Sequence, residues 1–144
     1  DKIIEFNQFN ESSSSTIKVV DEESKYFKRK FRLINFLSNK KTYQKIEIKI
    51  YRLKEYIEKN NIEKIDFMKI DTEGYELEIL LGLENKIKLV DIIMFEHHYD
   101  NMIKKNYTYN DIYELLIKNN FKKIYKCKMP FRKTFEYIFI NEKL

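Results

Sequence analysis

Hydrophobic residues are most concentrated in the middle of the chain, where they form two short and almost continuous apolar runs. Residues 65–70 (IDFMKI) and 90–96 (VDIIMFE) have the length and character of strands that are covered on both faces. Between them, residues 75–87 (YELEILLGLENKI) place their leucines and isoleucines near helical spacing. We therefore expect two parallel strands joined by an amphipathic helix that packs across the sheet.

The C-terminal part of the chain follows a different pattern, in which apolar and polar residues alternate. Residues 122–129 (KKIYKCKM) and 134–141 (TFEYIFIN) both show the two-residue period of a strand. The only proline, Pro130, lies in the short break between them. This pattern predicts an antiparallel hairpin, preceded by a capped helix over residues 108–120 (TYNDIYELLIKNN).

The first third of the chain gives a weaker signal. Residues 46–50 (IEIKI) alternate cleanly and predict a strand, which a short helix near residues 53–60 (LKEYIEKN) follows. Residues 10–16 (NESSSST) are a polar loop. Residues 25–37 (KYFKRKFRLINFL) fit either a helix or an irregular basic and aromatic segment.

The order of these elements predicts an α/β fold. With 144 residues, the chain has the length of one domain and can bury a sizeable core. We expect residues 46–144 to form a β-α-β-α-β-α-β-β core, whose sheet is mostly parallel and ends in the antiparallel hairpin. Residues 1–45 are expected to form a peripheral segment that combines a strand, a loop and the basic and aromatic stretch.

Composition narrows the class of protein. The net charge of +5 is carried almost entirely by lysines scattered among Asn, Ile and Tyr, which argues against a nucleic-acid partner. No apolar run approaches the ~18–20 residues that span a bilayer. The single cysteine, Cys127, cannot form an internal disulfide, and a cytoplasmic location is therefore expected. The sequence predicts no oligomeric state.

Groups that can bind or move protons follow both buried runs. Residues 71–74 (DTEG) come directly after the first run, and residues 96–98 (EHH) end the second. Ligands of α/β sheets bind beyond the carboxyl ends of parallel strands, and we therefore expect these groups to face one crevice. A carboxylate or imidazole there could deprotonate a substrate hydroxyl. Alternatively, Asp71, Glu73 and Glu96 could bind a divalent metal together with a histidine.

Simpler structural roles are also open to the residues around this crevice. Gly74 suits a tight turn whose backbone passes close to another group. Glu73 could interact with the positive end of the following helix, and Glu76 and Glu78 are expected to be solvated helix positions. Adjacent side chains of a strand point in opposite directions, and so at most one of the two histidines is expected to face the crevice.

Residues 65–83 (IDFMKIDTEGYELEILLGL) resemble the motif of the FkbM family of S-adenosylmethionine-dependent methyltransferases. That motif is an apolar strand, Lys-Ile-Asp, a small or polar residue, Glu-Gly, and then Glu with a Leu-rich helix and a trailing Gly. The matching residues are Lys69, Ile70, Asp71, Glu73, Gly74, Glu76, Leu80 and Gly82. Residues 46–67 and 92–100 are also similar to the family, and the resemblance thus spans most of the chain.

This resemblance implies a class I, Rossmann-like methyltransferase fold, of which the chain would be the C-terminal part. It also implies methyl transfer from S-adenosylmethionine to a hydroxyl of a sugar, a lipid or a small natural product. The catalytic candidates are Asp71, Glu73, Glu96 and His97. The candidates for cofactor contact are Asp71 and Thr72, and those for substrate or metal binding are Lys69 and His98.

The chain departs from the family's pattern in its glycines. Such enzymes bind their cofactor through a glycine-rich loop after the first strand, whereas Gly74 and Gly82 are the only glycines here. The chain also opens on Asp1 rather than Met. We therefore expect it to be the C-terminal two-thirds of a methyltransferase domain.

Two other functions remain open on the sequence alone. The first is a catalytically inactive methyltransferase-fold remnant that binds a partner. The second is a basic RNA-binding module built on residues 25–36, where Tyr26, Phe27, Phe31 and Phe36 alternate with Lys and Arg.

Overall fold

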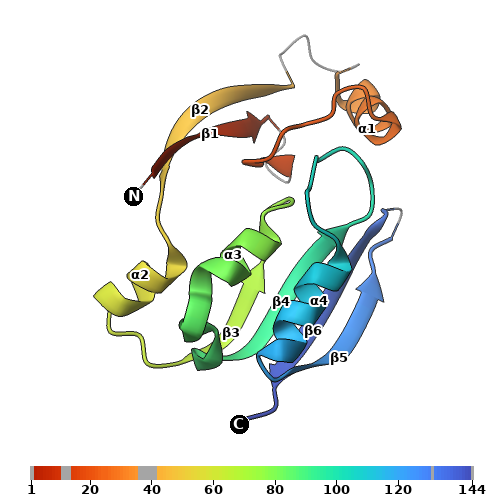
Figure 1. The fold of residues 1–144 in the computed structure, drawn as a ribbon. Coiled ribbons are helices and arrows are strands. Elements are labelled where there is room, and N and C mark those ends of the chain that lie inside the picture. The colour runs from red at the N-terminus through yellow and green to blue at the C-terminus, as the bar shows by residue number, and fades with distance from the viewer. Residues whose placement is uncertain (1, 11–13, 36–41, 131, 144) are drawn as a thin grey trace.

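Four strands from the second half of the chain form the central sheet of the protein (Figure 1). The computed structural model describes residues 2–10, 14–35, 42–130 and 132–143, without the side chains of residues 33–35. In spatial order the strands are β3 (Ile65–Ile70), β4 (Val90–His98), β6 (Thr134–Asn141) and β5 (Phe121–Lys128).

The strand directions correct one expectation from the sequence. β3 and β4 are parallel, as predicted, and β5 and β6 form the predicted antiparallel hairpin. However, β6 lies between β4 and β5 and is antiparallel to both. The prediction of a mostly parallel sheet is therefore wrong for the described residues, because the last strand of the hairpin inserts next to β4.

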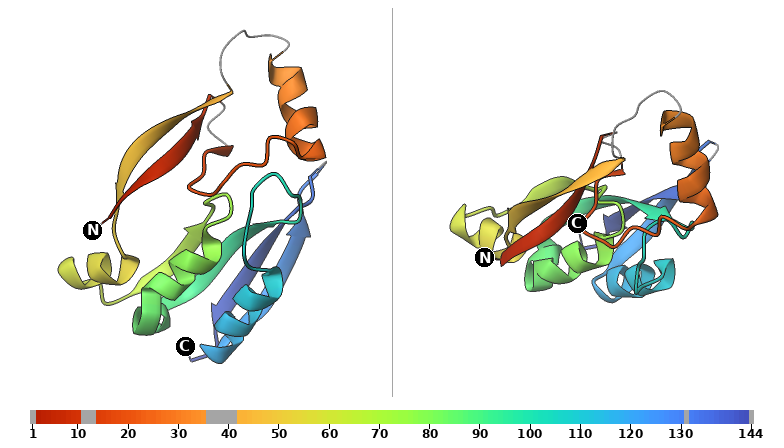
Figure 2. Two further views of the ribbon diagram at one scale, coloured as in Figure 1. Left: turned by 45° about the horizontal axis from the view of Figure 1, so that its top comes forward. Right: turned by 90° about the horizontal axis from the view of Figure 1, so that it is seen from above.

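One face of the sheet is covered by helices (Figures 1 and 2). α3 (Glu76–Leu83) connects β3 to β4 through the 3-10 helix η2 (Glu84–Leu89), and α4 (Tyr109–Lys118) precedes β5. α2 (Leu53–Lys59) adds Ile57 to the same hydrophobic core. None of the described helices combines the length and the apolar character that crossing a membrane requires.

The core between this sheet face and the helices is built from the apolar positions that the sequence pattern identifies. Phe95 of β4 stacks on Tyr137 and Phe139 of β6, with ring centroids 5.4 and 5.9 Å apart. Leu80 of α3 and Leu116 of α4 are completely or almost completely buried against them. The expected helix cap is also present, because Thr108 and Asp111 form a capping box at the start of α4.

The first part of the chain forms a second layer, which lies over the carboxyl ends of β3 and β4 (Figures 1 and 2). β1 (Lys2–Phe9) and β2 (Tyr43–Ile50) pair with each other in a separate antiparallel sheet. The loop after β4 is tied to this layer by backbone hydrogen bonds from Lys104 N–H to Val19 O and from Asp21 N–H to Met102 O. The strand expected at residues 46–50 therefore exists, but it does not extend the central sheet.

The basic and aromatic segment is a helix, α1 (Lys25–Asn35). Phe27 and Phe31 of this helix are buried together with Phe9, Met102 and Ile103. Rings that are packed in this way cannot stack on nucleic-acid bases, which removes two of the four aromatic residues that the RNA-binding alternative requires. Phe36, a third, lies outside the described residues.

Candidate functional site

A tight turn carries the chain from β3 into α3 and determines where Glu73 lies. Glu73 and Gly74 both have left-handed backbone conformations, with φ values of +50° and +98°. A Cβ atom on Gly74 would lie 2.8 Å from Cγ2 of Ile103, because the loop after β4 packs directly on this backbone. A non-glycine residue such as Glu73 adopts this conformation at a cost of roughly 1–3 kcal/mol, a strain that is often found at functional sites.

Glu76 stabilises this turn from the first position of α3. Its carboxylate accepts hydrogen bonds from Gly74 N–H at 2.8 Å, from the Thr72 hydroxyl at 3.2 Å, and from the Tyr107 hydroxyl. The Glu76 side chain is fully buried, and so the prediction that it is a solvated helix position is wrong. Glu78, in contrast, is partly exposed and forms an ion pair with Lys18.

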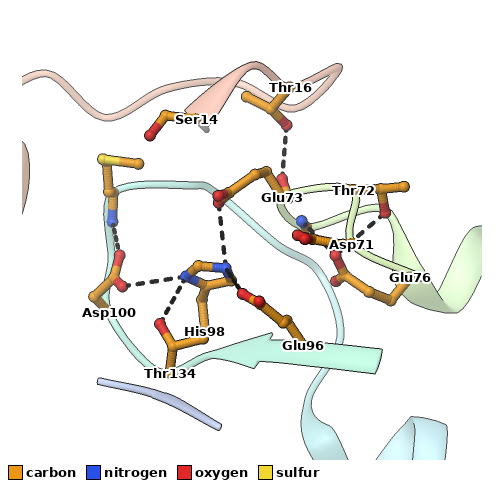
Figure 3. Close-up of polar contacts among 12 residues, drawn as sticks. Ser14, Thr16, Asp71, Thr72, Glu73, Glu76, Glu96, His98, Asp100 and Thr134 are labelled. Atoms are coloured by element: carbon orange, nitrogen blue, oxygen red, sulfur yellow. Dashed lines mark hydrogen bonds and ion pairs between the residues drawn. The ribbon is translucent and has the colours of Figure 1, made fainter. Parts of the chain in front are cut away.

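A cluster of acidic and imidazole groups lies beyond the carboxyl ends of β3 and β4 (Figure 3). Nε2 of His98 lies 3.2 Å from Oε2 of Glu73 and 3.7 Å from Oε2 of Glu96. On the other side of the ring, Nδ1 lies 3.1 Å from the Thr134 hydroxyl and 3.7 Å from Oδ2 of Asp100. The parallel pairing of β3 and β4 brings these groups together, since Glu96 and His98 are alternate residues of β4 and Glu73 follows β3.

Burial changes the proton affinity of this cluster. It raises the pKa of Glu73 to about 7, although the charge of His98 acts in the opposite direction. Burial also raises the pKa of Glu96, with a further contribution from Asp71. Burial alone would lower the pKa of His98, but the carboxylates of Asp100 and Glu73 outweigh it and the net shift is upward. The cluster can therefore accept or release a proton near neutral pH.

Two atoms on the Nε2 side of His98 have no hydrogen-bond partner among the residues that the structure describes, and on the Nδ1 side the same is true of Oδ2 of Asp100. Oε2 of Glu73 and Nε2 of His98 are almost inaccessible to solvent, and their 3.2 Å contact lacks the alignment of a hydrogen bond. An unsatisfied buried polar group costs about 1–3 kcal/mol, and most proteins avoid it. A ligand hydroxyl placed beside this pair, within hydrogen-bond distance of both atoms, would satisfy both by donating to one and accepting from the other.

Comparison with known protein families identifies the domain. Residues 3–123 match the family described as the methyltransferase FkbM domain, which is well over half of the chain. The chain belongs to the FkbM methyltransferase family. The match includes the turn at Glu73 and the end of β4, and it confirms the resemblance found in the sequence. A search of curated proteins and a search of solved structures gave no match.

The structure separates the two histidines of the FkbM domain. His97 points to the opposite side of β4 from His98, where its ring lies 4.8 Å from that of Tyr99 and near those of Tyr107 and Tyr109. Burial lowers the pKa of His97 to about 3, and the ring is therefore a neutral imidazole at physiological pH. His97 was expected to be catalytic, but it is His98 that joins the carboxylates.

Three other predicted site residues lie at the edge of this cluster. Asp71 forms a 3.2 Å ion pair with Lys69, and both side chains are substantially exposed. Asp71 acts on the cluster at a distance, because its charge helps to raise the pKa of both Glu73 and Glu96. Thr72 donates its hydroxyl to Glu76 and thus contributes to the turn.

Sequence reasoning missed Asp100 and Thr134, which hold the Nδ1 side of His98. Asp100 follows His98 by two residues, and this spacing could have suggested it. Thr134 lies directly opposite His98 in the pairing of β4 with β6. No local signal in the sequence indicates that contact, since it depends on the position of β6 in the sheet.

A cavity of about 540 Å³ adjoins the cluster and could admit a small molecule. Both histidines line it, together with Tyr99, Tyr107 and Lys105. Lys105 donates a hydrogen bond to the His98 carbonyl and so fixes the backbone at the end of β4. Among the residues that the structure describes, no group of three or more His, Cys, Asp or Glu side chains could hold a metal ion.

Proposed function

We propose that this FkbM domain is an S-adenosylmethionine-dependent O-methyltransferase, in which His98 removes the proton from the hydroxyl of the acceptor. The observation that carries the proposal is the pair of unsatisfied buried atoms, Oε2 of Glu73 and Nε2 of His98, in a cluster next to a cavity. Family membership supports the methyl transfer, and the proton affinity of the cluster supports a hydroxyl as the acceptor.

The surroundings of His98 suit a general base. Thr134 and Asp100 hold Nδ1, which orients the ring and leaves Nε2 as the atom that receives the proton. When the acceptor O–H bond breaks, its proton moves to Nε2 and leaves an alkoxide oxygen as the nucleophile. The imidazolium that forms is stabilised by Glu73 and Glu96, whose carboxylates lie on the Nε2 side. A general base of this kind contributes about 10²–10⁴-fold to the rate.

The described residues do not by themselves fit the methyl donor, which would supply an electrophilic methyl group. A glycine-rich loop would provide the usual contact, but the backbone space beside Gly74 is filled by Ile103 and Lys105. Gly82 lies within α3 and not in a loop. The roles proposed for His98 and its neighbouring carboxylates therefore concern the methyl acceptor and not the methyl donor.

The proposal is tested by supplying the protein with S-adenosylmethionine that carries a labelled methyl group and with a panel of sugar, lipid and polyol acceptors. We expect a methyl ether as the product. The rate should be low at acidic pH and should rise to a plateau as His98 loses its proton, with a midpoint above 6.5 because the pKa of His98 is raised.

Two results would contradict this proposal. One is transfer to nitrogen or carboxylate acceptors in preference to hydroxyls. The other is binding of S-adenosylmethionine with no transfer to any acceptor, which would favour a binding module that retains the methyltransferase fold.

A further inference from the structure

A second and larger cavity, of about 930 Å³, lies between α1 and the turn that joins β5 to β6. These two elements face each other in both views of Figure 2, although they are about a hundred residues apart in the chain. Asp21, Tyr99, Asp100 and Asn101 line both this cavity and the one beside His98. The two cavities therefore adjoin, and a single ligand could extend from the larger cavity to the catalytic cluster.

The wall of the larger cavity is rich in positive charge. Its cationic residues are Lys25, Arg29, Lys30, Arg132 and Lys133. The chain has only four arginines, and two of them meet in this cavity from α1 and from the β5–β6 turn. Helical spacing explains the contribution of α1, because Lys25 and Arg29 are four residues apart and share one face of the helix.

Each acidic residue of the same wall has at least one partner among the described residues. Glu23 forms an ion pair with Lys28, and Asp21 accepts a hydrogen bond from the Glu23 N–H at 3.1 Å. Asp100 accepts a hydrogen bond from the Met102 N–H at 3.0 Å and lies near His98.

Lys30 donates a hydrogen bond to the Ser14 hydroxyl, but the other four cations of the wall differ from its acids. Lys25, Arg29, Arg132 and Lys133 form no ion pair with any residue that the structure describes. The cavity thus presents four cationic groups, two of them guanidinium groups, that no described acidic residue neutralises and that can bind an anion.

We propose that the acceptor substrate carries a phosphate group, which Arg29 and Arg132 bind while the hydroxyl of the same molecule lies at His98. A guanidinium group offers paired N–H donors that match two phosphate oxygens, and a phosphate ester, with three terminal oxygens and a charge of about −1.5 to −2, can accept from two such groups at once. The volume of the cavity is that of a site for a small molecule. This inference rests on the proposed function for the identity of the reacting group, but the anion site itself does not.

Inorganic pyrophosphate is a suitable probe, because its binding can be measured by calorimetry without any methyl transfer. We expect the double variant Arg29→Gln/Arg132→Gln to lose about tenfold or more in affinity, as expected when charge-assisted hydrogen bonds to phosphate are removed. The matched control is Arg32→Gln/Arg52→Gln, which removes the same net charge at positions that do not line this cavity. It should bind pyrophosphate with nearly the affinity of the wild type.

Equal losses of affinity in the two double variants, or no binding of pyrophosphate to the wild type, would overturn the inference.

Turnover assays then distinguish the possible sources of the phosphate. A lower KM for glucose 6-phosphate than for glucose supports a water-soluble phosphate ester, and binding only to phosphatidic acid vesicles assigns the phosphate to a lipid headgroup. If methyl transfer to uncharged hydroxyls proceeds without pyrophosphate binding, the proposed function stands and the inference fails. If pyrophosphate binds as expected but nothing is methylated, the anion site stands and the proposed function fails.

Discussion

Replacement of His98 by glutamine is expected to lower kcat for methyl transfer by about 10²–10⁴-fold, the usual contribution of a general base. Glutamine retains a polar side chain of similar length but cannot take up a proton. Thr134 and Asp100 contact Nδ1, whereas the proton is taken up at Nε2 only as the reaction proceeds. The substitution should therefore lower kcat much more than it changes KM. Steady-state kinetics of the purified variant, with its thermal unfolding midpoint as a check of the fold, measure this effect.

His97 provides a matched control on the adjacent residue. The variant His97→Gln alters a neutral, buried ring that lies on the other side of β4 from the carboxylates. Because His97 also lines the cavity, the variant is expected to change stability and KM, and to retain most of kcat. If His97→Gln abolishes transfer while His98→Gln does not, the assignment of the base is wrong.

Replacement of Glu76 by alanine is expected to lower the free energy of unfolding by about 3–5 kcal/mol, because it leaves several hydrogen-bond donors in the interior without an acceptor. The Gly74 N–H, the Thr72 hydroxyl and the Tyr107 hydroxyl all donate to this one carboxylate. For a domain of this length such a loss lowers Tm by roughly 10 °C. Urea denaturation monitored by circular dichroism measures the change.

Glu78→Ala is the control for this second prediction, since Glu78 lies two residues further along α3. Its ion pair with Lys18 is partly exposed to solvent, and removing it should cost about 1 kcal/mol or less. Similar losses in the two variants would mean that the Glu76 carboxylate does not hold the turn.

Much of the site could be predicted from the sequence, because its position follows from two parallel strands. Once residues 65–70 and 90–96 are recognised as neighbouring strands, Glu73 and Glu96 must end at the same edge of the sheet. The turn at Gly74 is equally local, since a glycine between a strand and a helix indicates a left-handed backbone there.

The errors arose where a residue's environment depends on distant parts of the chain. Whether His97 or His98 faces the cluster depends on which side of β4 the helices cover, and both sides of this strand are largely apolar in the sequence. The burial of Glu76 depends on Tyr107, which is 31 residues away. The sheet is less parallel than expected because β6 inserts beside β4 and β2 pairs with β1, and neither pairing has a local signal.

The central claim, that His98 lies in a cluster whose carboxylates, Glu73 among them, raise its pKa, can be tested without any substrate. The chain has only two histidines, and an NMR titration from about pH 5 to about pH 9 can follow both imidazole rings. We expect one ring to titrate above 6.5 and to shift downward in the variant Glu73→Gln, while the other remains neutral throughout. Two rings that both titrate near 6.5, or midpoints that Glu73→Gln leaves unchanged, would contradict the account.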